Sequence, residues 1–168
     1  PIVLILCNPR LRNLVLAAEQ AARLHDGVTV VATKNLAQGM AALVHFDPER
    51  EPAEVVARME EELTRTRCLE VTRAVRNTHV DGVAVRAGQA LALLDGRAVA
   101  AGDDELAVLE RAALLLGEAE LLTLYVGDGV SEDRASAGRA RLARACPRAQ
   151  VEVLEGGQPH YPFIVQAD

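Results

Sequence analysis

The stretch "VTVVATKNLAQGMAAL" (28–43) changes its pattern partway along its length. Its first five residues are mostly β-branched, which is typical of a buried strand. Asn35 follows a short polar connection, and Gln38 stands three positions later, the spacing of a helix N-cap and its capping-box partner. The stretch therefore predicts a strand, a turn and a helix that runs to about Phe46.

The same alternation recurs along the chain. "IVLIL" (2–6) precedes apolar residues at helical spacing, and Pro52 suits the first position of a helix. "LLTLYV" (121–126) predicts a strand, and Ser131 predicts the start of the next helix. Alternating strands and helices indicate an α/β protein with a mainly parallel sheet flanked by helices. Two further strands are expected near the end of the chain, at about 150–154 and 163–166.

The middle third of the chain has a different pattern. Residues 69–101 show partial two-residue alternation and contain Asp81-Gly82 and Asp95-Gly96. Asp-Gly between two β runs signals a type I′ hairpin turn. We therefore expect an antiparallel β-meander over 69–101, followed by a helix from Asp104. The overall prediction is one α/β domain over residues 1–168 with the meander within it.

Composition bounds the function. The 168 residues are half hydrophobic, enough for a substantial core, and a net charge of −6 disfavours nucleic acid as a partner. The three cysteines have no CxxC spacing, which indicates reduced thiols in a cytoplasmic protein. No apolar run reaches the roughly 18 residues of a membrane span, so membrane insertion is not expected. Because the chain opens on Pro1, we interpret it as part of a longer protein.

Ligands of open α/β sheets bind at the carboxyl ends of the strands, so the loops there are the candidate sites. In "CNPRLRN" (7–13), Asn8 or Asn13 is interpreted as a helix cap. "VGDGVSEDR" (126–134) has the outline of an anion-binding turn, but its acidic residues would repel a phosphate. We interpret it as a glycine turn that Ser131 caps, with acids that suit the helix dipole.

A third loop, "TKNLAQG" (33–39), carries Lys34, the only lysine in a chain whose other basic residues are arginines. Lysine and arginine are not equivalent at a phosphate or carboxylate, so a compact ammonium here suggests a ligand or partner. A merely solvated lysine is the alternative. The candidate binding residues of this loop are Thr33, Lys34, Asn35 and Gln38.

The fourth loop, "GGQPHYP" (156–162), combines the two conformational extremes of the backbone. Glycine permits positive φ or a close backbone approach, whereas proline fixes φ and removes a donor. The loop is therefore stiff, and it is either a rigid turn or a binding loop. Its candidate binding residues are Gly156, Gly157, Gln158, Pro159, His160 and Tyr161.

No catalytic arrangement is visible in the sequence. The four histidines lack the spacing of metal ligands, and there is no GxSxG elbow and no phosphate-binding glycine motif. We therefore predict no catalytic residue and no metal site. The residues alone indicate a soluble α/β domain that acts as a binding module.

Three blocks carry a resemblance to a known family: "VVATKNLAQGMAALVHFDPE" (30–49), "VTRAVRNTHVDGVAVRAGQALALLDGRAV" (71–99) and "VEVLEGGQPHYPFIV" (151–165). Together they resemble the C-terminal region of the bacterial fatty acid kinase, a multi-domain protein with a DAK2-type, dihydroxyacetone kinase-like domain. The likeness runs in collinear order over nearly the whole chain. One departure is the loop 7–13, which is longer than expected and holds Pro9.

The resemblance implies a division of labour. ATP and magnesium would belong to an upstream kinase domain, which a middle domain follows, and this chain would have no cofactor of its own. The chain would be a non-catalytic part of an ATP-dependent phosphotransferase that docks an acyl-binding partner subunit. Whether it also forms a homodimer stays open. The alternative is an independent small-molecule or acyl-chain binding domain that holds a carboxylate or phosphate near Thr33, Lys34 and Asn35.

Overall fold

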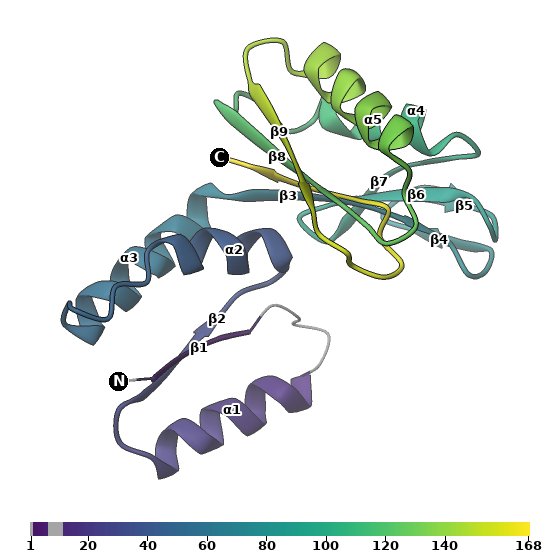
Figure 1. Cartoon of the computed structure of the whole chain (residues 1–168). Helices are drawn as coiled ribbons and strands as arrows, with labels where there is room; N and C mark the ends of the chain where they lie inside the picture. Colours follow the sequence, from purple (N-terminus) through teal and green to yellow (C-terminus); the bar gives the residue numbers. More distant parts are fainter. Residues whose placement is uncertain (1, 7–11) are drawn as a thin grey trace. The chain divides into compact units, whose positions relative to one another are not determined.

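The computed structural model describes residues 2–6 and 12–168, with side chains from residue 13 onward (Figure 1). Its contacts fall into two compact units, Pro1–Thr66 and Arg67–Asp168, and each is described by itself. The single domain over residues 1–168 stays a prediction. Asn8 and Pro9 lie outside the described residues, so the capping role expected for Asn8 is not addressed.

The first unit alternates strands and helices as the sequence predicts. Strands β1 and β2 pair in parallel, and Pro52 opens α3. A small apolar core joins Val31, Ala42, Val55 and Met59 from β2, α2 and α3. The elements are β1 (Ile2–Leu6), α1 (Arg12–Leu24), β2 (Val28–Ala32), α2 (Leu36–Val44) and α3 (Pro52–Arg65).

The second unit is built on a six-stranded sheet in the order β7-β6-β3-β10-β8-β9. Helix α4 packs against β3, β6 and β7, and α5 packs against β8 and β9, so both helices contribute to one hydrophobic core with the sheet (Figure 1). A separate two-stranded ribbon joins β4 and β5. The elements are β3 (Arg67–Arg73), β4 (Thr78–Val80), β5 (Val83–Val85), β6 (Ala90–Leu94), β7 (Arg97–Gly102), α4 (Glu105–Ala113), β8 (Leu121–Val126), α5 (Glu132–Ala145), β9 (Gln150–Glu155) and β10 (Phe163–Ala167).

The α/β class and the antiparallel meander are confirmed. Asp81 and Gly82 have φ of 51° and 83°, and Asp95 and Gly96 have the same values, as type I′ turns require. The side chain of Asp95 also accepts hydrogen bonds from the Cys68 amide and the Arg67 guanidinium. The second hairpin is thereby tied to the start of β3.

Parallel pairing is less extensive than the sequence suggests. It is found in β1–β2 and β8–β9, whereas β10 runs antiparallel to both β3 and β8. The reason is the connection between β9 and β10, which is the seven-residue loop 156–162. Parallel strands need a connection of roughly a dozen residues or more, so β10 must return in the opposite direction to β9.

The helices also bear on membrane insertion. None of those in the described part of the chain is both long enough and apolar enough to cross a bilayer.

Helices α4 and α5 are joined by a charged contact at their surface. Glu110 accepts hydrogen bonds from Arg144 Nε and Arg141 Nη1, each at 2.6 Å. The hydrogen bond from Arg144, followed by that from Arg141, lowers the pKa of Glu110 from 4.5 to about 2. The ionised carboxylate is thus favoured in the folded chain relative to the unfolded one.

Glu110→Gln should therefore lower the urea midpoint of unfolding at pH 7. A carboxyl group with a lowered pKa stabilises the fold above its unfolded value of about 4.5, and this stabilisation disappears as the pH falls toward 2. The difference between the wild type and the variant should shrink over that range. As a control, Glu118→Gln removes an exposed ion pair with Arg148 and should change the midpoint little. A Glu110→Gln effect that is independent of pH would contradict this account.

Candidate functional site

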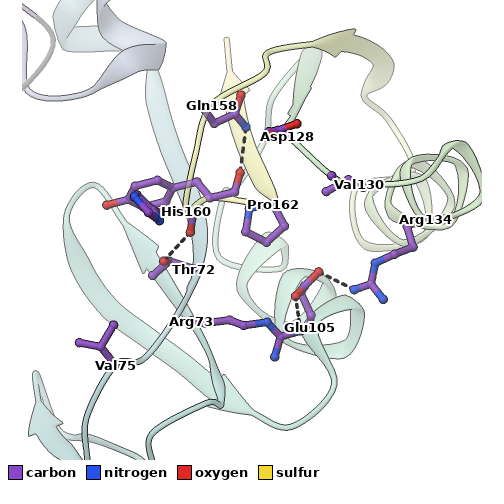
Figure 2. Close-up of a pocket in the computed structure, with 12 residues that line it drawn as sticks. Thr72, Arg73, Val75, Glu105, Asp128, Val130, Arg134, Gln158, His160 and Pro162 are labelled. Carbon is purple, nitrogen blue, oxygen red and sulfur yellow. Dashed lines mark hydrogen bonds and ion pairs between the residues drawn. The ribbon is translucent and has the colours of Figure 1, made fainter.

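A cavity of about 620 Å³ opens within the second unit (Figure 2). Its walls come from the end of β3, the first residue of α4, the connection between β8 and α5, and the loop 156–162. Gln158, His160 and Tyr161, three of the residues that the sequence singles out, line this cavity.

The loop 156–162 is fixed to the end of β8 by the side chain of Gln158. Its Nε2 donates to the carbonyl oxygens of Tyr125 and Tyr161 at 3.1 Å and 3.0 Å. Backbone hydrogen bonds run in parallel with this bridge, from the Gly127 amide to Pro162 and from the Asp128 amide to the Gln158 carbonyl. The loop is therefore held at several points rather than free to move as a plain connection.

The close approach of the two connections depends on Gly127. A Cβ at this position would lie 2.3 Å from the carbonyl oxygen of Tyr161, which is far inside van der Waals contact. Gly157 has a φ of +61°, so the positive φ that the sequence suggests for the glycine pair is found at this residue. Glycines on both connections thus permit the packing that Gln158 then locks.

His160 stands exposed at the edge of the cavity. Its φ is 69°, an uncommon conformation for a residue other than glycine. The Thr72 hydroxyl donates to the His160 carbonyl at 2.8 Å, so β3 fixes the backbone there (Figure 2). The adjacent Tyr161 is half-buried. The loop thus presents a histidine and a tyrosine in a defined geometry.

One wall of the cavity carries two arginines that share one buried carboxylate. Glu105 is only 4% exposed, and its oxygens accept from Arg73 at 2.8 Å and from Arg134 at 2.5 Å (Figure 2). Glu105 lies in the first turn of α4, where the helix dipole also favours a negative charge. Both guanidinium groups remain partly exposed, so they can contact a bound group while their positions are fixed.

Thr33, Lys34, Asn35 and Gln38 belong to the first unit. Asn35 caps α2 by accepting from the Gln38 amide at 2.9 Å, as predicted. The Gln38 side chain departs from a standard capping box, because it accepts from the Lys34 amide and donates to the Leu63 carbonyl. It thereby joins α2 to α3. Thr33 is buried and Lys34 is exposed.

These residues and the loop 156–162 belong to different units, so a shared binding face stays a prediction. Gly156, Gly157 and Pro159 do not line the cavity, although they are part of the loop that bounds it. Ser131 caps α5, as the sequence predicts, with its hydroxyl 3.4 Å from the Arg134 amide.

Sequence reasoning missed the polar residues that complete the site, which are Thr72, Arg73, Glu105, Asp128 and Arg134. The ion pairs join residues 29 and 32 positions apart, and no local spacing signals such a contact. Asp128 was part of a loop interpreted as a simple turn. Within residues 2–6 and 12–168, no three His, Cys, Asp or Glu side chains are grouped so as to hold a metal ion.

Comparison with known proteins identifies the family. Residues 2–168 match the FakA-like C-terminal family, which is described by its likeness to the C-terminal part of a fatty acid kinase protein, and the chain belongs to it. Protein YloV of Bacillus subtilis is 32% identical over 166 residues, and an uncharacterized protein of Staphylococcus aureus is 28% identical over 163 residues. Each alignment covers 95% of this chain but 30% of the relative, so the chain spans less than a third of their length.

Solved structures share the fold at low sequence identity. A DegV family protein from Corynebacterium glutamicum has a TM-score of 0.69 and 16% identity over 98% of this chain and 74% of its own. The dihydroxyacetone kinase of C. freundii has a TM-score of 0.66 and 16% identity, over 98% and 37%. The fatty acid kinase B3 protein of Streptococcus pneumoniae, loaded with linoleic acid, has a TM-score of 0.63 and 10% identity, over 99% and 71%.

Gln158→Ala should destabilise the second unit by about 1–3 kcal/mol, because it leaves the Tyr125 and Tyr161 carbonyls without their donor. Denaturant unfolding measures this change. His160→Asn is the matched control in the same loop, since asparagine also tolerates positive φ, and it should shift stability by no more than about 0.5 kcal/mol. Equal stability of Gln158→Ala and the wild type would show that the bridge does not hold the loop.

Proposed function

We propose that this chain is the non-catalytic C-terminal module of a fatty acid kinase-like protein, and that it docks an acyl-binding partner protein. The docking face is the cavity bounded by Arg73, Glu105, Arg134 and the loop 156–162. The observation that carries the proposal is the loop itself, which Gln158 fixes to β8 and which presents His160 and Tyr161 beside the cavity.

The physical chemistry of this face suits a partner protein. A loop that is already ordered loses little conformational freedom on binding, so more of the contact energy appears as affinity. Tyrosine and arginine are the residue types most often found as interface anchors. Family membership supports the choice of partner, because the family is named for a component of a fatty acid kinase.

We further propose that ATP, magnesium and phosphoryl transfer belong to the kinase and middle domains of a longer polypeptide. The aligned relatives are more than three times as long as the aligned region, which leaves room for such domains. In this arrangement the module brings the partner's bound fatty acid to the upstream kinase domain. The residues of the cavity then hold the partner and do not take part in the chemical step.

Tyr161→Ala should weaken association with a DegV-type acyl-binding protein from the same genome by about 1–3 kcal/mol, roughly 5- to 150-fold in Kd. Titration calorimetry measures the affinity, and circular dichroism shows whether the fold is intact. Tyr161→Phe keeps the ring and should bind more tightly than the alanine variant. If Tyr161→Ala binds like the wild type, the loop is not part of the docking face.

The second candidate function is direct binding of a small molecule or acyl chain. It is favoured by the fold likeness to a solved fatty-acid-binding DegV protein from Thermus thermophilus, which has a TM-score of 0.59 and covers 96% of this chain. Lys34 is the exposed charged group near Thr33 and Asn35 that would meet a carboxylate or phosphate. However, the Asn35 oxygen and both ends of the Gln38 amide already have partners within the unit.

Lys34→Arg separates the two functions. If Lys34 binds a carboxylate as a compact donor, arginine keeps the charge but changes the geometry, and affinity for a long-chain fatty acid should fall without a change in Tm. Equilibrium dialysis of the wild type and the variant measures this. Equal binding of fatty acid by both proteins would remove the proposed role of Lys34, and no binding by the wild type would remove the second function.

A further inference from the structure

Strand β9 forms one edge of the six-stranded sheet, and within the described residues it pairs with β8 on one side only (Figure 1). The amides of Gln150 and Gly156 point toward β8, where they donate to the Glu120 and Val126 carbonyls. Peptide groups alternate in direction along a strand, so those of Val151, Val153 and Glu155 point outward. An outward row of unpaired donors and acceptors is a template for another strand.

Arg139 closes one end of this edge. Its Nε donates to the outward Val151 carbonyl at 3.3 Å. The outward peptide groups of Val153 and Glu155 are the part of the edge beyond this contact. A strand that pairs there would form only a few backbone hydrogen bonds, so its side chains must supply much of the specificity.

A second cavity, of about 550 Å³, lies along the same edge. It is lined by Val153 and Glu155 of β9 and by Glu132, Ala135 and Ser136 of α5, together with the β8–α5 connection. Val153 is 37% exposed and Leu154 is 47% exposed. Successive side chains of a strand face opposite sides, so the edge offers an acidic cavity on the helix side and an apolar residue on the other.

The charge of this cavity selects the occupant. Asp128, Glu132 and Glu155 line it, and the guanidinium of Arg139, which also lines it, already donates to the Val151 carbonyl. A basic side chain would be attracted to this surface. A second copy of the chain would instead bring acidic edges together, and like charges across a strand pair are destabilising.

We propose that the outer edge of β9 binds an extended segment of another polypeptide in which basic and apolar residues alternate. Its backbone pairs with Val153 and Glu155. Its basic side chains enter the cavity between Glu132 and Glu155, and its apolar side chains face Leu154. This interaction does not rest on the docking of an acyl-binding protein.

The probe is a labelled octapeptide of alternating lysine and valine, titrated into the 168-residue chain and followed by fluorescence anisotropy. The double variant Glu132→Gln/Glu155→Gln should weaken binding by roughly three- to tenfold. The matched control, Glu51→Gln/Glu60→Gln, removes the same charge from exposed sites of the first unit and should bind like the wild type. Equal weakening by both double variants would overturn the proposal, because binding would then follow net charge alone.

Two further measurements test strand pairing. A peptide with proline in place of two central valines should lose binding, because proline cannot donate to a ladder. Hydrogen exchange of the Val153 and Glu155 amides should slow when the original peptide is bound. Retained binding by the proline peptide, or unchanged exchange at both amides, would contradict strand addition. Concentration-dependent dimerisation of the chain that Val153→Lys abolishes would identify a second copy as the occupant and would equally overturn the proposal.

Discussion

The bridge from Gln158 Nε2 to the Tyr125 and Tyr161 carbonyls is the interaction on which the site of the second unit depends. It joins the end of β8 to the connection that carries the chain from the sheet edge at β9 to β10 in the interior. Gly127 allows these segments to meet, since a side chain there would collide with the Tyr161 carbonyl. The same contacts that fix the path of the chain therefore also fix the rim of the cavity.

The charges around that cavity follow a similar logic. Glu105 is buried, and a buried carboxylate is costly unless it is paired. Arg73 and Arg134 supply the pairing from β3 and α5, so three elements of the unit meet at one carboxylate. The arginines are positioned by the fold before any partner arrives. This pre-organisation links the stability of the unit to the docking function that we propose.

Much of the fold could be predicted from sequence, because its signals are local. The Asp95-Gly96 turn, the Asn35 cap and the strand 121–126 each follow from neighbouring residues. The antiparallel direction of β10 was not predicted, although the shortness of the loop 156–162 already required it. At the site, the loop stood out through its glycines and prolines. Its companion, the Arg73–Glu105–Arg134 cluster, did not, because only tertiary structure brings those residues together.

The central claim is that the loop 156–162 and the cavity beside it form the docking face for an acyl-binding protein. Hydrogen–deuterium exchange of this chain, with and without a DegV-type acyl-binding protein from the same genome, tests it most directly. The account predicts slower exchange in peptides that cover 72–75 and 158–162, with little change over α2. Protection confined to other segments, with unchanged exchange over 158–162 in a complex shown to form, would contradict it.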